Sequence, residues 1–179
     1  DERRKTLVLV RDWLGQKSIY WAETAEGWAF ASEIKALFAL GGIPRELDLQ
    51  ALAHYMSLRY LPGERTFFQG ISKIPAAHIA EITASERRFE RSWTPSYLPK
   101  HTGSEEQIIQ GLDELMSHVV SQHLMSEVPL GAFLSGGIDS SLVVAYSALA
   151  SAEPVRTFSI GVHDAAQSEL PWARMVAEQ

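Results

Sequence analysis

One short segment of this chain combines glycines, hydroxyls and a carboxylate in a spacing that could bind a phosphate. Residues 135–141 read Ser-Gly-Gly-Ile-Asp-Ser-Ser, after the apolar run 129–134 and before the helix-like run 142–149. Two adjacent glycines let the backbone turn sharply, so several N–H groups can point into one concavity at the positive end of the following helix. Such a concavity binds phosphate or pyrophosphate, and the serine hydroxyls can add hydrogen bonds to the same anion.

Asp139 lies inside this string, and its predicted task differs from that of the serines. A carboxylate does not favour a bare polyphosphate, so its use would be to hold or orient the Mg²⁺ that accompanies a nucleotide. The P-loop of common nucleoside triphosphatases needs a Lys that is absent here, and the nucleophile elbow needs a Gly at the position of Phe133. A tight turn with a capping Asp is the simpler alternative, but the complete string between strand and helix favours nucleotide binding.

The elements around the string alternate between helix and strand. Ser104 and Gln107 form a capping box for a helix that runs to about His123. Its apolar stripe comprises Ile108, Leu112, Leu115, Met116, Val119 and Leu124. The run 129–134 predicts a fully buried parallel strand, and 155–162 a second strand. A last helix, capped by Ser168 with Pro171 in its first turn, completes a βαβα order, for which we expect an open parallel sheet with a right-handed crossover.

The first half of the chain has a different pattern, dominated by short strands. We predict these strands over residues 7–10, 18–22, 28–31, 78–82 and 88–93. A short helix capped by Ser32 is expected to end near Leu40. A second helix is expected from Asp48, because its apolar residues fall on one helical face at Leu49, Leu52, Ala53 and Met56. Residues 94–103 contain Pro95, Pro99 and Gly103, so we place a linker and a domain boundary there.

Composition excludes several classes of protein. The 179 residues are 46% apolar, carry a net charge of −6 and include no Cys, which rules out a disulfide framework, a Cys-ligated metal and a catalytic thiol within this chain. The negative charge argues against a nucleic-acid partner, and the absence of a long apolar run argues against a membrane one. No secretion signal is found, so we expect a cytoplasmic location. His118 and His123 do not share a helix face and are not expected to bind a metal.

The string from Ser135 to Ser140 resembles the signature Ser-Gly-Gly-x-Asp-Ser of the PP-loop ATP pyrophosphatases. Residues 123–131 and 157–161 on either side of it look like the glutamine-dependent asparagine synthetases. Upstream, residues 9–17, 30–37 and 71–78 resemble the later part of the class II glutaminase domain of the same family. The resemblance therefore covers nearly the whole chain.

This resemblance implies a fold and a reaction. The fold class is α/β and α+β: residues 1–100 would be the C-terminal part of an Ntn-type αββα glutaminase domain with its linker. Residues 104–179 would begin a PP-loop adenine-nucleotide α-hydrolase-like domain with a parallel sheet. Members of the family hydrolyse glutamine, pass ammonia to the second domain, and use ATP with Mg²⁺ to adenylate aspartate. The products are asparagine, AMP and pyrophosphate.

Site residues follow from the resemblance position by position. Those implied to bind ATP or pyrophosphate are Ser135, Gly136, Gly137, Asp139 and Ser140, with Asp139 on the metal. Phe133 and Ile160 match positions that pack against or hydrogen-bond to the adenosine, and sheet core is the alternative for both. Asp12 matches the residue that pairs with the α-amino group of glutamine, and a surface ion pair is its alternative. Glu169 lies where relatives often carry an acid near the nucleotide, and contact with the helix dipole explains it equally well.

The sequence also departs from the family pattern. The family's nucleophile is an N-terminal Cys, so we assign no catalytic residue in this chain and expect an internal piece of a longer enzyme, inactive by itself. Ala76-Ala77 replaces the usual Pro-Gly before His78. Related enzymes acting on another carboxylate, such as β-lactam synthetases or amide-forming enzymes of gene clusters, remain an alternative, as does a degenerate ATP-binding module. Family members are often dimers, so a homodimer is possible.

Overall fold

The computed structural model describes residues 1–162 and 168–179, and the chain divides into two compact units. The first unit comprises Asp1–Leu98 and the second Pro99–Gln179. Each unit has its own sheet or sheets, helices and core. No helix in the described residues is long and apolar enough to cross a membrane.

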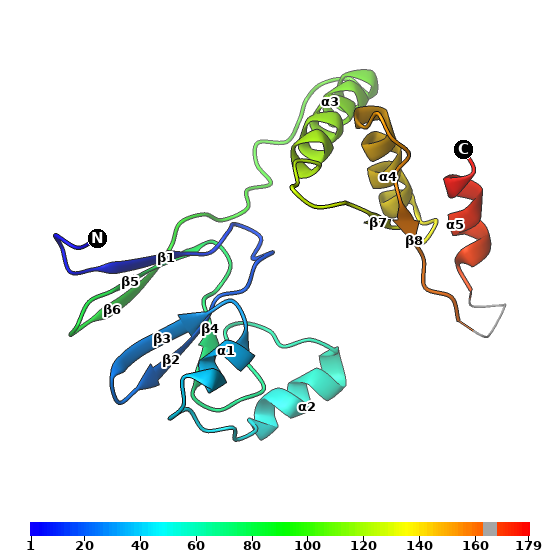
Figure 1. The fold of residues 1–179 in the computed structure, drawn as a ribbon. Helices are drawn as coiled ribbons and strands as arrows, with labels where there is room; N and C mark the ends of the chain where they lie inside the picture. The colour runs from blue at the N-terminus through cyan, green and yellow to red at the C-terminus, as the bar shows by residue number, and fades with distance from the viewer. Residues whose placement is uncertain (163–167) are drawn as a thin grey trace. The chain divides into compact units, whose positions relative to one another are not determined.

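The first unit is built on two three-stranded antiparallel sheets (Figure 1). One has the order β1-β5-β6, with bounds Leu7–Val10, His78–Ile82 and Arg87–Arg91. The other has the order β3-β2-β4, with bounds Gly27–Ala31, Tyr20–Thr24 and Ile71–Lys73. Both predicted hairpins are therefore confirmed, with Tyr20 paired to Ala31 and His78 paired to Arg91.

Alternation along β2 explains the layers of this unit. Trp21 packs against the core cluster between the two sheets, which contains Leu9 and Ala80, whereas the next residue, Ala22, lies in a second cluster with Leu37. Successive side chains of a strand point to opposite faces. The β3-β2-β4 sheet is thus covered on one face by the other sheet and on the other by the short helix α1 (Ile34–Ala39).

The helix ends of the first unit test two capping predictions. Asp48 caps α2 (Leu49–Leu58) by accepting hydrogen bonds from the N–H groups of Gln50 and Ala51 at 2.9 and 3.1 Å, as predicted. The prediction that Ser32 caps α1 is wrong. Glu33 is the N-cap residue, in extended conformation and without a side-chain cap bond, because α1 begins at Ile34, one residue later than a cap at Ser32 requires.

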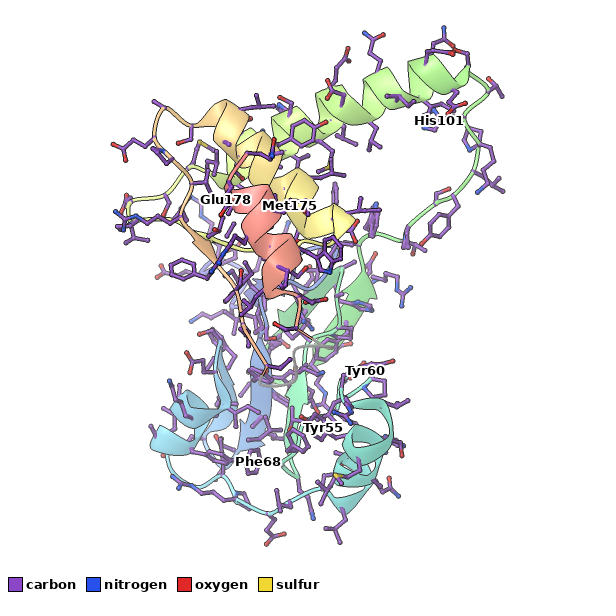
Figure 2. The ribbon with its side chains drawn as sticks, turned by 90° about the vertical axis from the view of Figure 1, so that its right-hand side faces the viewer. Tyr55, Tyr60, Phe68, His101, Met175 and Glu178 are labelled. Atoms are coloured by element: carbon purple, nitrogen blue, oxygen red, sulfur yellow. The ribbon has the colours of Figure 1, made fainter. Side chains whose placement is uncertain are left out.

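Much of the apolar face of α2 is exposed. Ala51 is the buried residue of this helix, and Tyr55 packs edge-on against Phe67 with ring centroids 5.1 Å apart (Tyr55 is labelled in Figure 2). Leu49 and Met56, which the helical spacing placed on one apolar face, are 72% and 75% exposed. The periodicity identified the helix correctly, but not which of its residues are buried.

The second unit places helices around a minimal parallel pair of strands. These strands are β7 (Ala132–Phe133) and β8 (Thr157–Phe158), in register at Ala132↔Thr157. The helices are α3 (Glu105–His123), α4 (Ile138–Ala150) and α5 (Leu170–Ala177). The parallel pairing and the predicted capping box at Ser104 are confirmed. Leu134, Val144 and Ala173 form the core, and the Tyr146 hydroxyl of α4 donates to Asp113 of α3 at 2.6 Å.

Four expectations for the second unit are corrected. The strands are two residues long rather than six and eight, and Phe133 is 78% exposed rather than buried, because β7 has one parallel neighbour in the described residues. Helix α4 begins at Ile138, inside the serine and glycine string. The α3 stripe is also largely exposed, with Leu112 and Leu115 more than half accessible, and Val120 is the buried residue of that helix.

Candidate functional site

The string 135–141 forms a loop that closes on itself through two hydroxyls. Ser140 Oγ donates to the Gly137 carbonyl at 3.2 Å, so its single proton is used there. The 3.0 Å contact between the hydroxyls of Ser135 and Ser140 must then use the Ser135 proton, while Ser135 Oγ accepts from the Gly137 N–H at 3.3 Å. Both hydroxyl protons therefore stabilise the loop in this structure, where the sequence predicted direct bonds to an anion.

The donors that remain open belong to the backbone. Gly137 is the N-cap residue of α4, and the first helical bond runs from Ser141 N to Gly137 O at 3.0 Å. The N–H groups of Ile138, Asp139 and Ser140 consequently have no acceptor within the helix. They lie at its positive end, where the partial charge of the helix dipole favours an anion.

Asp139 and Ser141 differ in what their side chains can reach. Asp139 lies in the first turn of α4 and is exposed, and no hydrogen bond or ion pair of its carboxylate is found among the described residues. Ser141 Oγ is buried without a hydrogen-bond partner, so it faces the interior rather than the open side of the loop. Asp139 thus remains available for a ligand, whereas Ser141 does not add to the exposed donors.

A cavity of about 280 Å³ opens beside this loop. It is lined by Phe133, Leu134, Ser135, Ser140, Phe158, Ser159, Ile160, Glu169 and Leu170. Five of the residues singled out from the sequence therefore share one cavity: Phe133, Ser135, Ser140, Ile160 and Glu169. The other three, Gly136, Gly137 and Asp139, belong to the loop but do not line the cavity. The cavity lies at the carboxyl ends of β7 and β8, which is where open parallel sheets bind ligands.

The lining combines an apolar part with a polar part. Phe133, Phe158 and Ile160 are 78%, 57% and 81% exposed, which leaves their faces open to a planar apolar group. Ser159 Oγ donates to the Leu134 carbonyl at 2.6 Å and so ties the two strand ends together. The sequence analysis did not single out four of the lining residues, Leu134, Phe158, Ser159 and Leu170. The available signal was the alternation of side chains along a strand, which turns every second side chain toward the same face.

Helix α5 forms one wall of the cavity because two glycines let it approach. Gly136 has a φ of +82°, and a Cβ built there would lie 2.5 Å from the backbone carbon of Trp172. A Cβ on Gly161 would lie 2.6 Å from Leu170 Cδ1. Ala173 of α5 is buried in the core of the second unit. The loop and the helix therefore fit together only with glycine at position 136, where the clash is with backbone, whereas at position 161 the Leu170 side chain could move aside.

Asp12 lies in a separate loop of the first unit, and the structure shows what its carboxylate does there. Its two oxygens accept hydrogen bonds from the N–H groups of Gln16 and Lys17 at 2.8 and 3.0 Å. The Lys17 bond and then the Gln16 bond lower the pKa of Asp12 below its ordinary value. Its carbonyl also accepts from the N–H groups of Gly15 and Ala77. Asp12 thus holds the backbone of residues 12–17 in place through these hydrogen bonds.

Arg11 holds the same loop from the other side, a role that the sequence analysis missed. Its guanidinium donates to the carbonyls of Gly15 at 2.7 Å, Lys17 at 3.0 Å and Ile74. Gly15 has a φ of +68°, and a Cβ there would lie 2.9 Å from Arg11 Nη2. An Arg beside an Asp at the end of a strand was the available signal, because the guanidinium presents several donors in a fixed geometry.

The departure noted before His78 places an alanine, Ala77, where the backbone favours glycine. Its φ is +58°, in the left-handed region, where a glycine carries no steric penalty. Its N–H donates to the Asp12 carbonyl at 2.9 Å, and its carbonyl accepts from the Ser92 N–H at 2.7 Å. These bonds keep Ala77 in a conformation that its side chain disfavours.

Comparison with known proteins agrees with both units. Residues 1–94 match the model described as the glutamine amidotransferase domain. The chain belongs to the glutamine amidotransferase domain family. Residues 111–179 match the model described as asparagine synthase. The predicted resemblance to the glutamine-dependent asparagine synthetases, which are enzymes, is confirmed.

Individual relatives match most of this chain. Asparagine synthetase (glutamine-hydrolysing) 3 of Bacillus subtilis is 32% identical over 166 residues, which cover 89% of this chain and 27% of that protein. A putative asparagine synthetase of Mycobacterium tuberculosis is 31% identical over 185 residues, covering 99% and 28%. The amidase chry2 of Gibberella zeae is 32% identical over 147 residues, covering 80% and 21%. The chain thus spans about a quarter of the length of these relatives.

Proposed function

We propose that this chain carries the ATP-binding loop of a glutamine-dependent asparagine synthetase, with part of the glutaminase domain before it. The observation that supports this most directly is the cavity at the carboxyl ends of β7 and β8, which lies beside a helix N-terminus with open N–H donors. Phosphates would lie on residues 135–140, and the adenine would pack on Phe133 and Ile160. The finer fold assignments, Ntn-type for residues 1–100 and PP-loop for 104–179, belong to this proposal, as does a cytoplasmic location.

The proposed reaction would activate the aspartate side-chain carboxylate, which is a poor electrophile until one of its oxygens becomes part of a good leaving group. An oxygen of the aspartate side-chain carboxylate attacks the α-phosphorus of ATP, and pyrophosphate leaves with the electron pair of the broken P–O bond. Ammonia from glutamine then attacks the acyl carbon, AMP leaves, and asparagine forms. The open N–H groups of residues 138–140 would stabilise the charge that develops on the departing pyrophosphate.

Asp139 would hold the Mg²⁺ that accompanies ATP. An exposed carboxylate without a described partner suits a cation that usually takes one or two protein carboxylates and completes its shell with phosphates and water. No group of three His, Cys, Asp or Glu side chains that could hold a metal occurs within 1–162 and 168–179, so phosphate and water would supply the other ligands.

For the first unit we propose that Asp12 helps to position glutamine. The support is the family resemblance, together with the rigid 12–17 loop that its carboxylate organises. The nucleophilic Cys of the family has no counterpart among these 179 residues, so no catalytic residue is assigned. Nucleic acid and membranes are not proposed as partners, and a homodimer remains a prediction.

The test is release of pyrophosphate and AMP by the full-length protein with ATP and Mg²⁺, measured with and without aspartate, using glutamine or ammonia. We expect release that requires aspartate. Asp139→Asn should lower it at limiting Mg²⁺, whereas Glu127→Gln, an exposed change in the same unit, should leave it unchanged. Release that does not depend on aspartate would favour a different carboxylate acceptor. No ATP turnover would indicate a degenerate module.

A further inference from the structure

We propose that Glu169 recognises the ribose of the nucleotide, by accepting hydrogen bonds from its 2′- and 3′-hydroxyls, and so selects ribonucleotides over deoxyribonucleotides. The inference rests on the proposed ATP site and adds a residue that decides which sugar that site accepts. It is argued from the position of Glu169, from the state of its carboxylate, and from the parts of a nucleotide that the rest of the cavity can bind.

The position of Glu169 is determined by packing on both sides. Glu169 immediately precedes α5, which approaches Gly136 of the loop at Trp172 and Gly161 beyond β8 at Leu170. Ala173, one turn into the helix, is 3% exposed and lies in the core. The start of α5 is therefore held between the loop and the end of β8, and Glu169 lines the cavity that they enclose.

The carboxylate of Glu169 is not used by the helix that it begins. It is the N-cap residue, yet its side chain makes no cap hydrogen bond, and the Leu170 N–H is instead bonded to Ser168 Oγ at 3.4 Å. Its own carbonyl accepts from Ala173 N at 3.0 Å, so the backbone contributes to the helix while the side chain does not. In the described parts of the chain no ion pair or hydrogen bond of this carboxylate is found, which leaves both oxygens free to accept.

The rest of the cavity leaves the sugar for Glu169. The N–H donors of residues 138–140 suit phosphate, and the exposed faces of Phe133 and Ile160 suit the base. The ribose joins these two parts of a nucleotide. An ionised carboxylate accepts hydrogen bonds and repels phosphate, so vicinal hydroxyls are the complementary group. Acidic side chains hydrogen-bond to ribose in the same way in dinucleotide-binding folds.

The experiment compares binding of ATP, 2′-deoxy-ATP and 3′-deoxy-ATP to the full-length protein with Mg²⁺ by calorimetry. We expect the parent protein to bind ATP about 10- to 100-fold more tightly than either deoxy analogue, which is the range for one hydrogen bond to a charged group. Glu169→Ala should weaken ATP binding by a similar factor and bring the three affinities close together. Glu178→Gln, at the other end of α5 (Figure 2), should keep the parent's preference.

The possible failures are distinguishable. If the parent protein binds no ATP, the proposed function itself fails. If ATP binds but Glu169→Ala leaves the ratio of ATP to deoxy-ATP affinity unchanged, the ribose assignment is overturned. If the variant instead loses discrimination between ATP and the triphosphate of purine riboside, the carboxylate recognises the exocyclic amine of the base, which also overturns it. Thermal unfolding of the variant should match the parent, because the Glu169 side chain makes no hydrogen bond or ion pair with the described residues.

Discussion

The loops after β1 and β7 both follow a short strand and both contain an Asp, but they distribute their hydrogen bonds in opposite ways. In residues 11–17 the Arg11 guanidinium donates to three carbonyls and the Asp12 carboxylate accepts from two N–H groups, so both of these charged groups already have protein partners. In residues 135–141 the side-chain hydroxyls bond within the loop while three helix N–H groups and Asp139 stay open. The first arrangement builds a rigid support, and the second is prepared for a ligand.

The largest effect is expected at Gly136, where the open loop meets α5. Gly136→Ala adds a Cβ that would lie 2.5 Å from the Trp172 backbone, at a φ of +82°. We expect displacement of α5 and a fall of about 100-fold in aspartate-dependent pyrophosphate release, since small misplacements of binding groups have effects of that size.

Gly63→Ala is the matched control for that change. Gly63 also has a positive φ, +67°, but a Cβ there meets nothing within 4 Å. It should cost only the backbone strain, about 1–2 kcal/mol, and leave the rate of pyrophosphate release near that of the parent protein. Equal losses of activity in both variants would mean that backbone conformation, not contact with α5, explains the Gly136 result.

A substitution of Arg11 tests whether the loop of residues 11–17 depends on the hydrogen bonds of the guanidinium. Arg11→Lys keeps the charge but cannot reach three carbonyls at once, so we expect the free energy of unfolding of the first unit to fall by about 2–4 kcal/mol. Urea unfolding followed by tryptophan fluorescence measures this, and Arg3→Lys, on the exposed N-terminal segment, is the control. A loss below about 0.5 kcal/mol would show that the loop does not depend on the guanidinium.

The pH dependence of stability should sharpen the role of Asp12. The N–H bonds from Lys17 and Gln16 lower the pKa of this carboxyl in the folded state. Its contribution is therefore complete above the ordinary pKa of an Asp and is lost as the pH falls through the lowered value. Asp12→Asn should be less stable than the parent at neutral pH, and the difference should shrink in acid. A difference that does not change with pH would contradict this account.

Ala77 should give the smallest effect, in a direction opposite to the others. Ala77→Gly removes the steric strain of the left-handed conformation at φ +58° but adds chain entropy to the unfolded state. We therefore expect the free energy of unfolding to rise by no more than about 1 kcal/mol. Ala77→Val, whose branched side chain disfavours this region, should instead lose at least about 1 kcal/mol. Thermal unfolding of the pair provides the comparison, and a Val variant as stable as the Gly variant would argue against strain at this position.

A structural feature could be predicted from the sequence where the residues that determine it lie close together along the chain. Asp48 and the Ser104–Gln107 box were predicted correctly because a cap is decided by residues within one turn. The Ser32 cap failed because α1 begins at Ile34, one residue later than that cap requires, and the local pattern does not determine the exact residue at which a helix begins.

The candidate site divides in the same way. The string from Ser135 to Ser140 identified the loop, because its chemistry lies in consecutive residues. The wall contributed by α5 could not be predicted, because it depends on how closely Trp172 approaches Gly136. Nor could Arg11 be assigned, since its carbonyl partner at Ile74 is 63 residues away along the chain. Burial of the stripes on α2 and α3 was the least predictable property, because periodicity shows a face but not what covers it.

The contact between Trp172 and Gly136 also has an optical consequence. Trp172 is the one tryptophan in the sequence from 99 to 179, and its side chain is 58% exposed beside the loop. The other four belong to the first unit, where Trp13 and Trp93 stack with ring centroids 5.4 Å apart. Indole emission depends on solvent contact, and stacked indoles give a distinct circular dichroism signal in the near ultraviolet. The two units therefore carry separate intrinsic reporters, so that occupancy of one loop and integrity of the other can be followed in a single unlabelled sample.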